Sequence, residues 1–137
     1  MDKLDAARRS ENMRRIKSKD TKPEIAVRRA VHALGFRFRL HRKELPGKPD
    51  LVLTRHRKVI LVHGCFWHSH RDPDCKDGRL PKSRLDYWLP KLARNKSRDA
   101  AAIRKLKRMG WSVLTVWECE CAHPDKLEYR LRLFLRS

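Results

Sequence analysis

The spacing of apolar residues predicts a helix near the start of the chain. Between Thr21 and Gly35, apolar side chains return at helical spacing, at Val27, Ala30, Val31 and Leu34. Thr21 is a suitable N-cap, and Gly35 fits the left-handed residue that commonly ends a helix. Pro23 is tolerated in the first turn, where its missing N–H would be unpaired. Glu24 completes a capping box if its carboxylate bonds the amide of Thr21.

Two apolar runs joined by a short polar segment predict a β-hairpin. Residues 51–53 and 58–62 are almost wholly apolar, as in strands that are buried on both faces. In an antiparallel pair, the start of one strand lies beside the end of the other. We therefore expect Asp50, which precedes the first strand, to lie close to Val62 and His63 at the end of the second.

The rest of the pattern predicts one strand before this hairpin and a helix, a strand and a helix after it. Residues 36–40 alternate between apolar and basic side chains, as in a half-buried strand. A long helix fits residues 83–109, in which Pro90 either causes a kink or marks a later start. Residues 111–117 fit a buried strand that the helix leads into, which suggests a crossover onto the sheet. Residues 127–135 fit both a strand and a helix, and we favour the helix.

The charge of the chain favours a polyanionic partner. The sequence has 35 Lys and Arg against 16 Asp and Glu, a formal net charge of +19. Self-repulsion of this size is tolerated most easily beside a polyanion, so nucleic acid is the leading candidate. A basic RNA-binding protein without chemistry is the simpler alternative. Residues 1–20 form a polar, basic arm that we expect either to order on the partner or to be a disordered tail.

The sequence gives no reason to expect a membrane or secreted protein. No run approaches the roughly 18 apolar residues that span a bilayer, and residues 1–20 lack the apolar segment of a signal peptide. We expect a cytoplasmic, nucleoid-associated protein. In a reducing compartment, cysteines are thiols or metal ligands more often than disulfides. This expectation applies to Cys65, Cys75, Cys119 and Cys121.

The segment HGCFWHSHRDPDC, residues 63–75, offers ligands for a structural metal. Thiolate and imidazole groups bind zinc, and four of them complete a tetrahedral site. The candidate ligands are Cys65, His70, Cys75 and Cys119, and Cys121 could replace Cys119. The alternative is a set of reduced thiols and surface histidines without a metal.

A second site is expected where the hairpin strands meet. A carboxylate beside imidazoles can hold Mg²⁺ and move protons, and Asp50, His63 and His68 offer these groups. With a polyanionic partner, the natural reaction is metal-assisted phosphodiester hydrolysis. The simpler interpretation of Asp50 is a turn residue after proline. Phe66, Trp67 and Trp88 could stack on bases or wedge between them, although core packing is the commoner role of such side chains.

Five segments, taken in order, resemble the very short patch repair (Vsr) endonuclease family. They are ENMRRIKSKDTKPE, LPGKPD, HGCFWHSH, SRLDYWLPKLARN and GWSVLTVWEC, and the resemblance runs from about Ser10 to Cys119. It implies an α/β, restriction-endonuclease-like fold of the PD-(D/E)xK type, in which helices flank a central mixed sheet. It also implies a basic arm over residues 1–20 that contacts DNA, and one endonuclease domain with a structural zinc site over residues 21–137.

The activity that the resemblance implies is Mg²⁺-dependent nicking of one DNA strand next to a T:G mismatch, the product of 5-methylcytosine deamination. Asp50 would bind Mg²⁺ through its carboxylate and Val62 through its backbone carbonyl. His68 would be the general base, and His63 and Glu24 would contact metal-bound waters. For Glu24, the resemblance therefore favours an active-site role, whereas its spacing from Thr21 favours a helix cap.

The resemblance also implies a zinc site and a set of side chains that wedge into DNA. The zinc ligands would be Cys65, His70, Cys75 and Cys119, although residues 71–74 make the ligand loop longer than is usual in the family. The wedging residues would be Phe66, Trp67, Trp88 and Met13. We expect a monomer, because a mismatch needs only one nick, and mismatch-repair proteins are possible partners. Two alternatives remain: a restriction-like or branched-DNA nuclease of the same fold, and a non-catalytic, zinc-stabilised DNA-binding module.

Overall fold

A computed structural model describes residues 21–70, 75, 78 and 80–137 of the chain. The predicted basic arm over residues 1–20, with Met13, lies outside the described residues, as does the segment 71–74. Among the described residues, no helix combines the length and the apolar character that crossing a bilayer requires.

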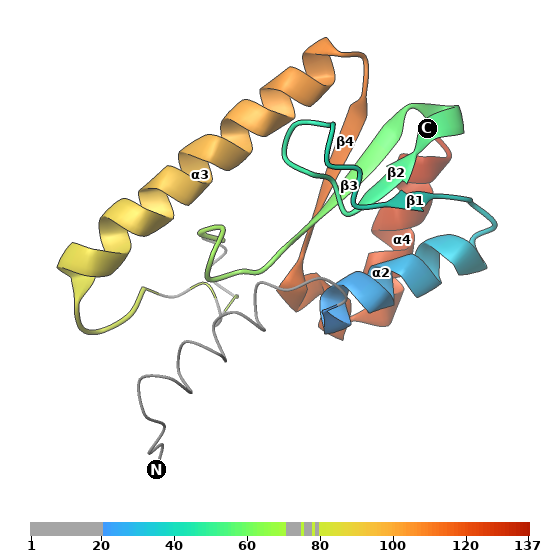
Figure 1. The fold of residues 1–137 in the computed structure, drawn as a ribbon. Helices are drawn as coiled ribbons and strands as arrows, with labels where there is room; N and C mark the ends of the chain where they lie inside the picture. Colours follow the sequence, from blue (N-terminus) through green and yellow to red (C-terminus); the bar gives the residue numbers. More distant parts are fainter. Residues whose placement is uncertain (1–20, 71–74, 76–77, 79) are drawn as a thin grey trace.

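A mixed four-stranded sheet forms the centre of the fold (Figure 1). Its strands are β1 (Arg39–Leu40), β2 (Leu51–Leu53), β3 (Lys58–His63) and β4 (Ser112–Trp117), in the order β1-β2-β3-β4. The pairs β1–β2 and β2–β3 are antiparallel, whereas β3 and β4 are parallel. The predicted hairpin is therefore confirmed.

The predicted strand over residues 36–40 is shorter than expected. Only Arg39 and Leu40 pair with β2, and both side chains are exposed at the edge of the sheet. Phe36 and Phe38 are half-buried and pack against the core. An edge strand has one neighbour, so few ladder bonds fix its length, and the alternation in the sequence reflects the packing of the two phenylalanines.

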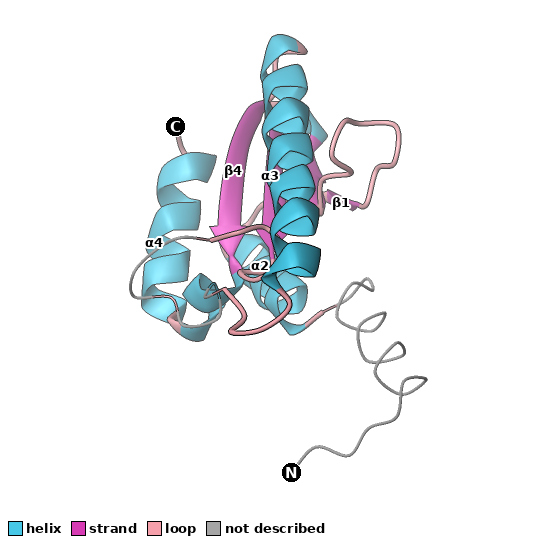
Figure 2. Cartoon of the chain, turned by 90° about the vertical axis from the view of Figure 1, so that its left-hand side faces the viewer, coloured by secondary structure: helices cyan, strands magenta, loops and turns pink. Residues whose placement is uncertain are grey.

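Helices cover both faces of the sheet (Figures 1 and 2). They are α2 (Lys22–Ala33), α3 (Leu85–Arg108) and α4 (Pro124–Leu135), and two short 3-10 helices are η1 (Thr54–His56) and η3 (Glu118–Ala122). Leu51 and Leu53 pack with residues of α2 and α4, whereas Val52 packs with Leu106 of α3. Successive strand residues point to opposite faces, so both faces of β2 are buried. The predicted α/β fold, a mixed sheet flanked by helices, is confirmed.

The helix boundaries follow most of the predicted signals. Thr21 caps α2, because its Oγ1 accepts the N–H of Glu24 at 3.5 Å. Gly35 and Gly110, with φ of 90° and 92°, follow α2 and α3 in the left-handed conformation. Pro90 lies inside α3, so the interpretation of a later helix start is wrong. α4 buries three leucines at helical spacing, which confirms a helix there: Leu127, Leu131 and Leu135.

A buried lysine connects the sheet to the end of α4. Lys58 Nζ donates to the carbonyl oxygens of Phe134 at 2.6 Å, Leu135 at 3.1 Å and Ser137 at 2.9 Å. The last carbonyls of a helix have no intrahelical donor, and a cation also suits the negative end of the helix dipole. Lys58 therefore acts as the C-terminal cap of α4.

Replacing this lysine is expected to destabilise the fold. In Lys58→Met the carbonyls of residues 134, 135 and 137 lose a buried donor, so we expect the free energy of unfolding to fall by about 2–3 kcal/mol. Urea denaturation followed by circular dichroism measures the change. Lys126→Met, which removes an exposed lysine of α4, is the control. A loss no larger than that of the control would contradict the capping role of Lys58.

Candidate active site

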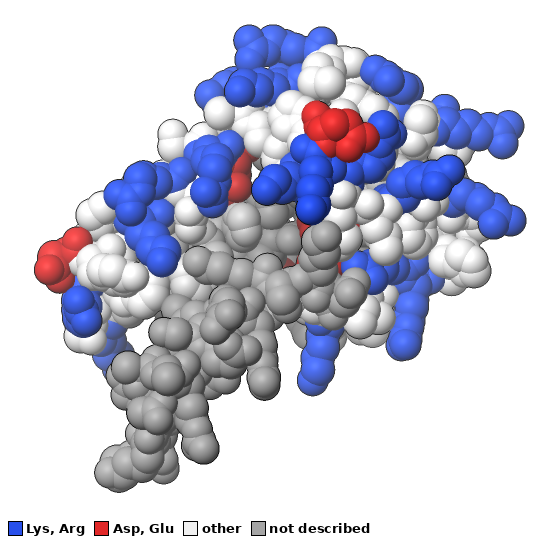
Figure 3. Space-filling view, in the orientation of Figure 1, with Lys and Arg blue, Asp and Glu red and all other residues white. Residues whose placement is uncertain are grey.

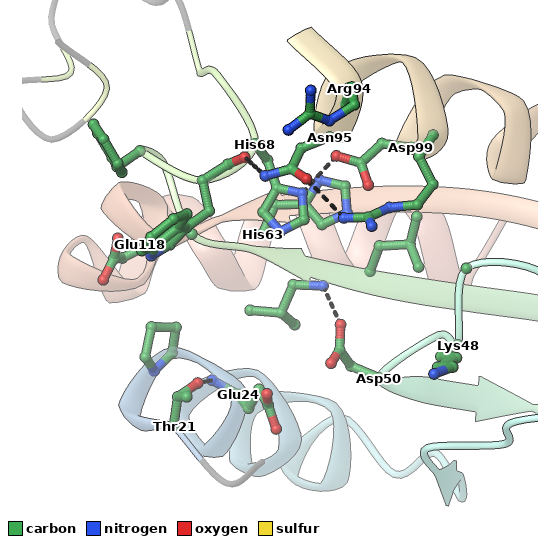
Figure 4. A pocket seen from close by; sticks show the side chains of 18 of the residues that line it. Thr21, Glu24, Lys48, Asp50, His63, His68, Arg94, Asn95, Asp99 and Glu118 are labelled. Atoms are coloured by element: carbon green, nitrogen blue, oxygen red, sulfur yellow. Dashed lines mark hydrogen bonds and ion pairs between the residues drawn. The ribbon is translucent and has the colours of Figure 1, made fainter. Parts of the chain in front are cut away.

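One cleft lies where the start of β2 meets the end of β3 (Figure 4). It has a volume of about 1270 Å³, and residues from α2, the β2–β3 hairpin, the loop after β3 and α3 line it. The predicted residues Glu24, Asp50, Val62, His63 and His68 all belong to this lining. The aromatic residues Phe66, Trp67 and Trp88 belong to it as well. The structure therefore brings together residues that are far apart in the sequence.

Asp50 belongs to the lining of this cleft, and the hairpin places it there. Its backbone N–H donates to Ile60 O at 3.1 Å, which continues the β2–β3 pairing, and its Oδ2 accepts the N–H of Val62 at 2.6 Å. Burial raises the pKa of Asp50 to about 7, against the opposing effect of the Val62 hydrogen bond, and the nearby Glu24 raises it further. A carboxyl group whose ionised form is disfavoured in this way is a candidate for binding a cation.

The two histidines of the cleft lie against each other, and an aspartate of α3 contacts one of them. The rings of His63 and His68 stack with centroids 3.9 Å apart and an interplanar angle of 8°. His68 Nδ1 lies 2.5 Å from Asp99 Oδ2 (Figure 4). Burial lowers the pKa of His63 to about 4, and the neighbouring His68 lowers it as well. His63 is therefore neutral near pH 7, whereas His68 has a carboxylate partner that can orient its ring.

Sequence reasoning missed Asp99. Its partner His68 is far away in the sequence, and only the packing of α3 across the sheet brings the two together. A signal existed, because Asp86 and Asp99 are the only acidic residues of the strongly basic helix α3. An isolated acidic residue in such a helix is a reasonable candidate for a specific partner.

The backbone N–H of Glu24 takes part in the N-terminal cap of α2, whereas its side chain lines the cleft. Its N–H is the group that Thr21 caps, while its Oε2 lies 3.0 Å from Arg28 Nη2 and 3.4 Å from His41 Nε2. One ligand atom each from Glu24, His41 and Asp50 lie within 4.8 Å of one another. The structure shows the half of the predicted capping box in which Thr21 accepts the N–H of Glu24, whereas the Glu24 carboxylate contacts Arg28 and His41 and lies near Asp50. No pattern in the sequence indicated that His41 lies at this site.

A second cluster, next to the cleft, has the composition of a zinc site. The ligand atoms of Cys65, His70, Cys75 and Cys119 all lie within 4.8 Å of one another. Burial raises the pKa of the Cys65 and Cys119 thiols. Cys121 lies elsewhere, with its Sγ 3.7 Å from Pro23 O. The segment is the 3-10 helix η3 rather than an extended strand, and this helical path separates Cys119 from Cys121.

The aromatic residues form a cluster in the lining of the cleft. Phe66 lies edge-to-face with Trp67 and Trp88, with ring centroids 5.2 Å apart in both pairs. These three half-buried rings pack on one another rather than in the hydrophobic core on either face of the sheet. Lys91 Nζ lies 5.6 Å from the ring of Trp67 and 5.6 Å from that of Tyr87. Aromatic faces beside a cation are suited to contacts with nucleic-acid bases.

Basic side chains surround this cleft. Figure 3 shows Lys and Arg spread over the visible face, including the region of α3, with few acidic side chains among them. The cleft itself is lined by four basic and four acidic residues: Lys48, Lys91, Arg94 and Arg98, and Glu24, Asp50, Asp99 and Glu118. A positive surface around a cleft attracts the phosphate backbone of nucleic acid.

Comparison with known proteins connects these features to a family. The sequence model of the family described as DNA mismatch endonuclease Vsr matches residues 1–76. The chain is 51% identical to the Type II nicking enzyme V.XorIIP of Xanthomonas oryzae over 134 residues, 98% of this chain and 96% of the relative. It is 40% identical to the Type II nicking enzyme V.NmeAIP of Neisseria meningitidis over 131 residues, 96% of this chain and 91% of the relative. It is 42% identical to the DNA mismatch endonuclease Vsr of Escherichia coli over 123 residues, 90% of this chain and 77% of the relative. The chain therefore belongs to the Vsr family of DNA mismatch endonucleases.

Proposed function

We propose that this endonuclease uses Mg²⁺ to nick one strand of duplex DNA next to a T:G mismatch, and so starts the repair of deaminated 5-methylcytosine. The observation that carries the proposal is the single cleft in which a half-buried aspartate, two stacked histidines and a cluster of aromatic rings meet. The aspartate and the histidines supply the groups needed for metal-assisted hydrolysis, and the aromatic rings can distort the duplex. Membership of the family and its nicking relatives support the same activity.

The donor atoms beside Asp50 suit Mg²⁺, which prefers oxygen ligands. Asp50 supplies a half-buried carboxylate, and the backbone carbonyl of Val62 is the second ligand that we assign. The N–H and C=O of one strand residue point to the same side of the strand, and the N–H of Val62 donates to Asp50. When bound, Mg²⁺ supplies positive charge for the scissile phosphate and lowers the pKa of a bound water.

The affinity for Mg²⁺ is expected to depend on pH. The pKa of Asp50 is raised to about 7, so the metal must displace a proton below this pH and meets a carboxylate above it. The half-saturating Mg²⁺ concentration should rise about tenfold for each pH unit below 7 and be nearly constant from pH 8 to 9. Calorimetric titration of Mg²⁺ into the protein at several pH values tests this. A constant affinity from pH 5.5 to 8 would contradict the assignment of Asp50 as a ligand.

We assign the role of general base to His68. With Asp99 accepting the Nδ1–H, the Nε2 of His68 has its lone pair available to take a proton from water. The stacked ring of His63 limits the rotation of His68, and as a neutral imidazole His63 can hydrogen-bond a water in the cleft. The pair thus provides one group that moves a proton and one that orients its source.

We assign recognition of the mismatch to the aromatic cluster. Inserting a side chain between base pairs costs a few kcal/mol per step, and less at a weak pair such as T:G. Phe66, Trp67 and Trp88 form a preformed group of rings, and Asn95 Nδ2 donates to Trp67 O at 3.2 Å, which fixes Trp67 to α3. The role of Met13, on the basic arm, as a further wedging residue stays a prediction.

We assign a structural zinc ion to the cluster of Cys65, His70, Cys75 and Cys119. The loop from residue 64 to 70 carries both His68 and the aromatic pair, and its own hydrogen bonds include His70 N–H to Cys65 O at 2.9 Å. A metal bound at both ends of this segment would hold its conformation. The ion would thus stabilise the catalytic loop without taking part in the reaction.

The zinc assignment predicts about one zinc per chain by elemental analysis. Cys65→Ser should lose the metal and lower the melting temperature, because three ligands bind it weakly and the thiolates then repel each other. Cys121→Ser, which changes a thiol outside the cluster, is the matched control and should keep its zinc. Full retention of zinc by Cys65→Ser and by Cys75→Ser would contradict the site.

A strand-resolved cleavage assay tests the proposed function as a whole. T:G, fully paired and branched duplexes are each incubated with and without Mg²⁺, and we expect one nick, on one strand, in the T:G duplex only. Equal cleavage of paired duplexes would indicate a restriction-like nuclease, and cleavage of branched duplexes a junction enzyme. Tight binding with no nick under any divalent ion would indicate a DNA-binding module. The expected monomer and the possible mismatch-repair partners stay predictions.

A further inference from the structure

One arginine of α2 connects two elements of the cleft through a single nitrogen. Arg28 Nη2 lies 3.0 Å from Glu24 Oε2 and 3.2 Å from His41 Nε2, and the latter two atoms are 3.4 Å apart. A guanidinium group only donates hydrogen bonds, and its terminal nitrogen carries two hydrogens. Glu24 therefore accepts a hydrogen from Arg28, and His41 accepts the second one in the tautomer whose Nε2 carries no hydrogen.

This nitrogen joins α2 to the segment after β1 that is bonded to the backbone of Asp50. Glu24 and Arg28 are one turn apart on α2, whereas His41 follows β1 and donates its backbone N–H to Asp50 O at 3.3 Å. His41 has φ of 50°, in the left-handed region that residues other than glycine rarely adopt. Such a conformation persists where surrounding contacts fix it, and the bonds to Asp50 and Arg28 are contacts of this kind.

The charge of Arg28 acts on the same site. Arg28 Nη2 lies 3.0 Å from Glu24 Oε2, and one ligand atom of Glu24 lies within 4.8 Å of one of Asp50, so the charge of Arg28 is close to the cation site as well. A positive charge at this distance also repels a divalent cation bound to Asp50. Arg28 thus has two effects with opposite consequences for the site: it orients an acidic side chain toward the cation, and it weakens the attraction for that cation.

We propose that Arg28, supported by His41, is a positioning residue that holds the Glu24 carboxylate beside the cation site at Asp50 while weakening the affinity of that site for the cation. The proposal rests on the proposed function only for the presence of a divalent cation at Asp50. It predicts that removal of Arg28 separates two quantities: cation affinity rises, while the nicking rate at saturating cation falls. A purely structural role for Arg28 would not raise cation affinity.

The probe for cation affinity is Mn²⁺ alone, measured by electron paramagnetic resonance of the free ion over the full-length, zinc-loaded protein without DNA. We expect Arg28→Met to bind Mn²⁺ about three- to tenfold more tightly, because a positive charge near the site is lost. Arg28→Lys, which keeps the charge, should bind Mn²⁺ within about twofold of the original protein. Arg29→Met removes an exposed charge from the same helix and is the matched control, with an affinity expected to change by less than about twofold.

Nicking of a T:G duplex at saturating Mg²⁺, in single turnover, gives the second quantity. We expect Arg28→Met and Arg28→Lys to nick about tenfold more slowly, because neither side chain can bond Glu24 and His41 with one planar group. His41→Leu removes the second acceptor and should also slow the reaction, with Mn²⁺ affinity unchanged. His41→Gln offers an amide oxygen to Arg28 and should recover most of the rate lost in His41→Leu.

Unchanged or weaker Mn²⁺ binding by Arg28→Met, or an unchanged nicking rate in both Arg28 variants, would overturn the proposal. Thermal unfolding of each variant shows whether it is folded. If the Arg28 variants do not fold, His41→Leu and His41→Gln test the same contact with Arg28 unchanged. Failure of the proposed function has a different signature: Mn²⁺ binds and Asp50→Asn removes that binding, yet T:G duplexes are not nicked. If Asp50→Asn leaves Mn²⁺ binding unchanged, both proposals are wrong.

Discussion

Asp50→Asn should reduce Mg²⁺-dependent nicking by at least about a thousandfold and leave the protein folded. The amide oxygen of asparagine can still accept the Val62 N–H that now bonds Asp50 Oδ2 at 2.6 Å, so the hairpin is retained. What is lost is the anionic ligand, and a neutral amide is a poor substitute for a carboxylate toward Mg²⁺. Single-turnover nicking of a T:G duplex at increasing Mg²⁺ measures the effect. Activity within tenfold of the original protein would contradict the role of Asp50.

The same substitution should raise stability, and the direction follows from the pKa. The pKa of Asp50 is about 7 in the folded protein, above its ordinary value of 3.8, so the folded state holds a proton that the unfolded state releases between these values. Stability therefore falls as pH rises from about 4 to about 7, by up to about 4 kcal/mol, and stays lower above that. Removing the ionisable group removes this cost.

Urea denaturation of Asp50→Asn is thus expected to give a higher free energy of unfolding at pH 8 and little change at pH 4. Glu128→Gln, which removes an exposed carboxylate of α4, is the control and should show no such difference between the two pH values. A decrease in stability at pH 8 would mean that the carboxylate is stabilised by partners rather than strained by burial. Loss of activity with gain of stability would distinguish a functional aspartate from a structural turn residue.

Local pairing explains why part of the site could be predicted from the sequence. A hairpin brings together residues on either side of a short turn, so the apolar runs 51–53 and 58–62 were enough to place Asp50 beside Val62. The start of α2 could be predicted in the same way, because the cap of Thr21 on Glu24 spans three residues. Each of these contacts depends on a periodicity or a cap that is visible within one segment.

The contacts that escaped prediction depend on how separate segments pack. Asp99 reaches His68 because α3 crosses the sheet, and His41 reaches Glu24 because the edge of the sheet lies against α2. Neither follows from the spacing of residues along the chain. The choice between Cys119 and Cys121 was open for a related reason: it depends on the 3-10 helix η3 that follows β4, and no pattern in the sequence predicted that helix.

His68→Ala should reduce the nicking rate by about 10²- to 10⁴-fold, the usual contribution of a general base, with little change in the affinity for a T:G duplex. Asp99→Leu should cause a smaller loss, because the imidazole remains but its orientation and tautomer are no longer fixed through Nδ1. Single-turnover nicking gives the rates, and fluorescence anisotropy of a labelled duplex gives the affinities. His32→Ala, an exposed histidine of α2, is the control.

The double variant decides whether the two residues act as one unit. If Asp99 acts only through His68, removing it from His68→Ala should change the rate no further, so the double variant should match His68→Ala. Independent roles would instead multiply the two losses. Asp99 is also a carboxylate in the cleft proposed to bind DNA, and if its only effect were on charge, Asp99→Leu would tighten DNA binding without slowing the nick. A slower nick, together with equal rates for His68→Ala and the double variant, is the result that the 2.5 Å contact between His68 Nδ1 and Asp99 Oδ2 predicts.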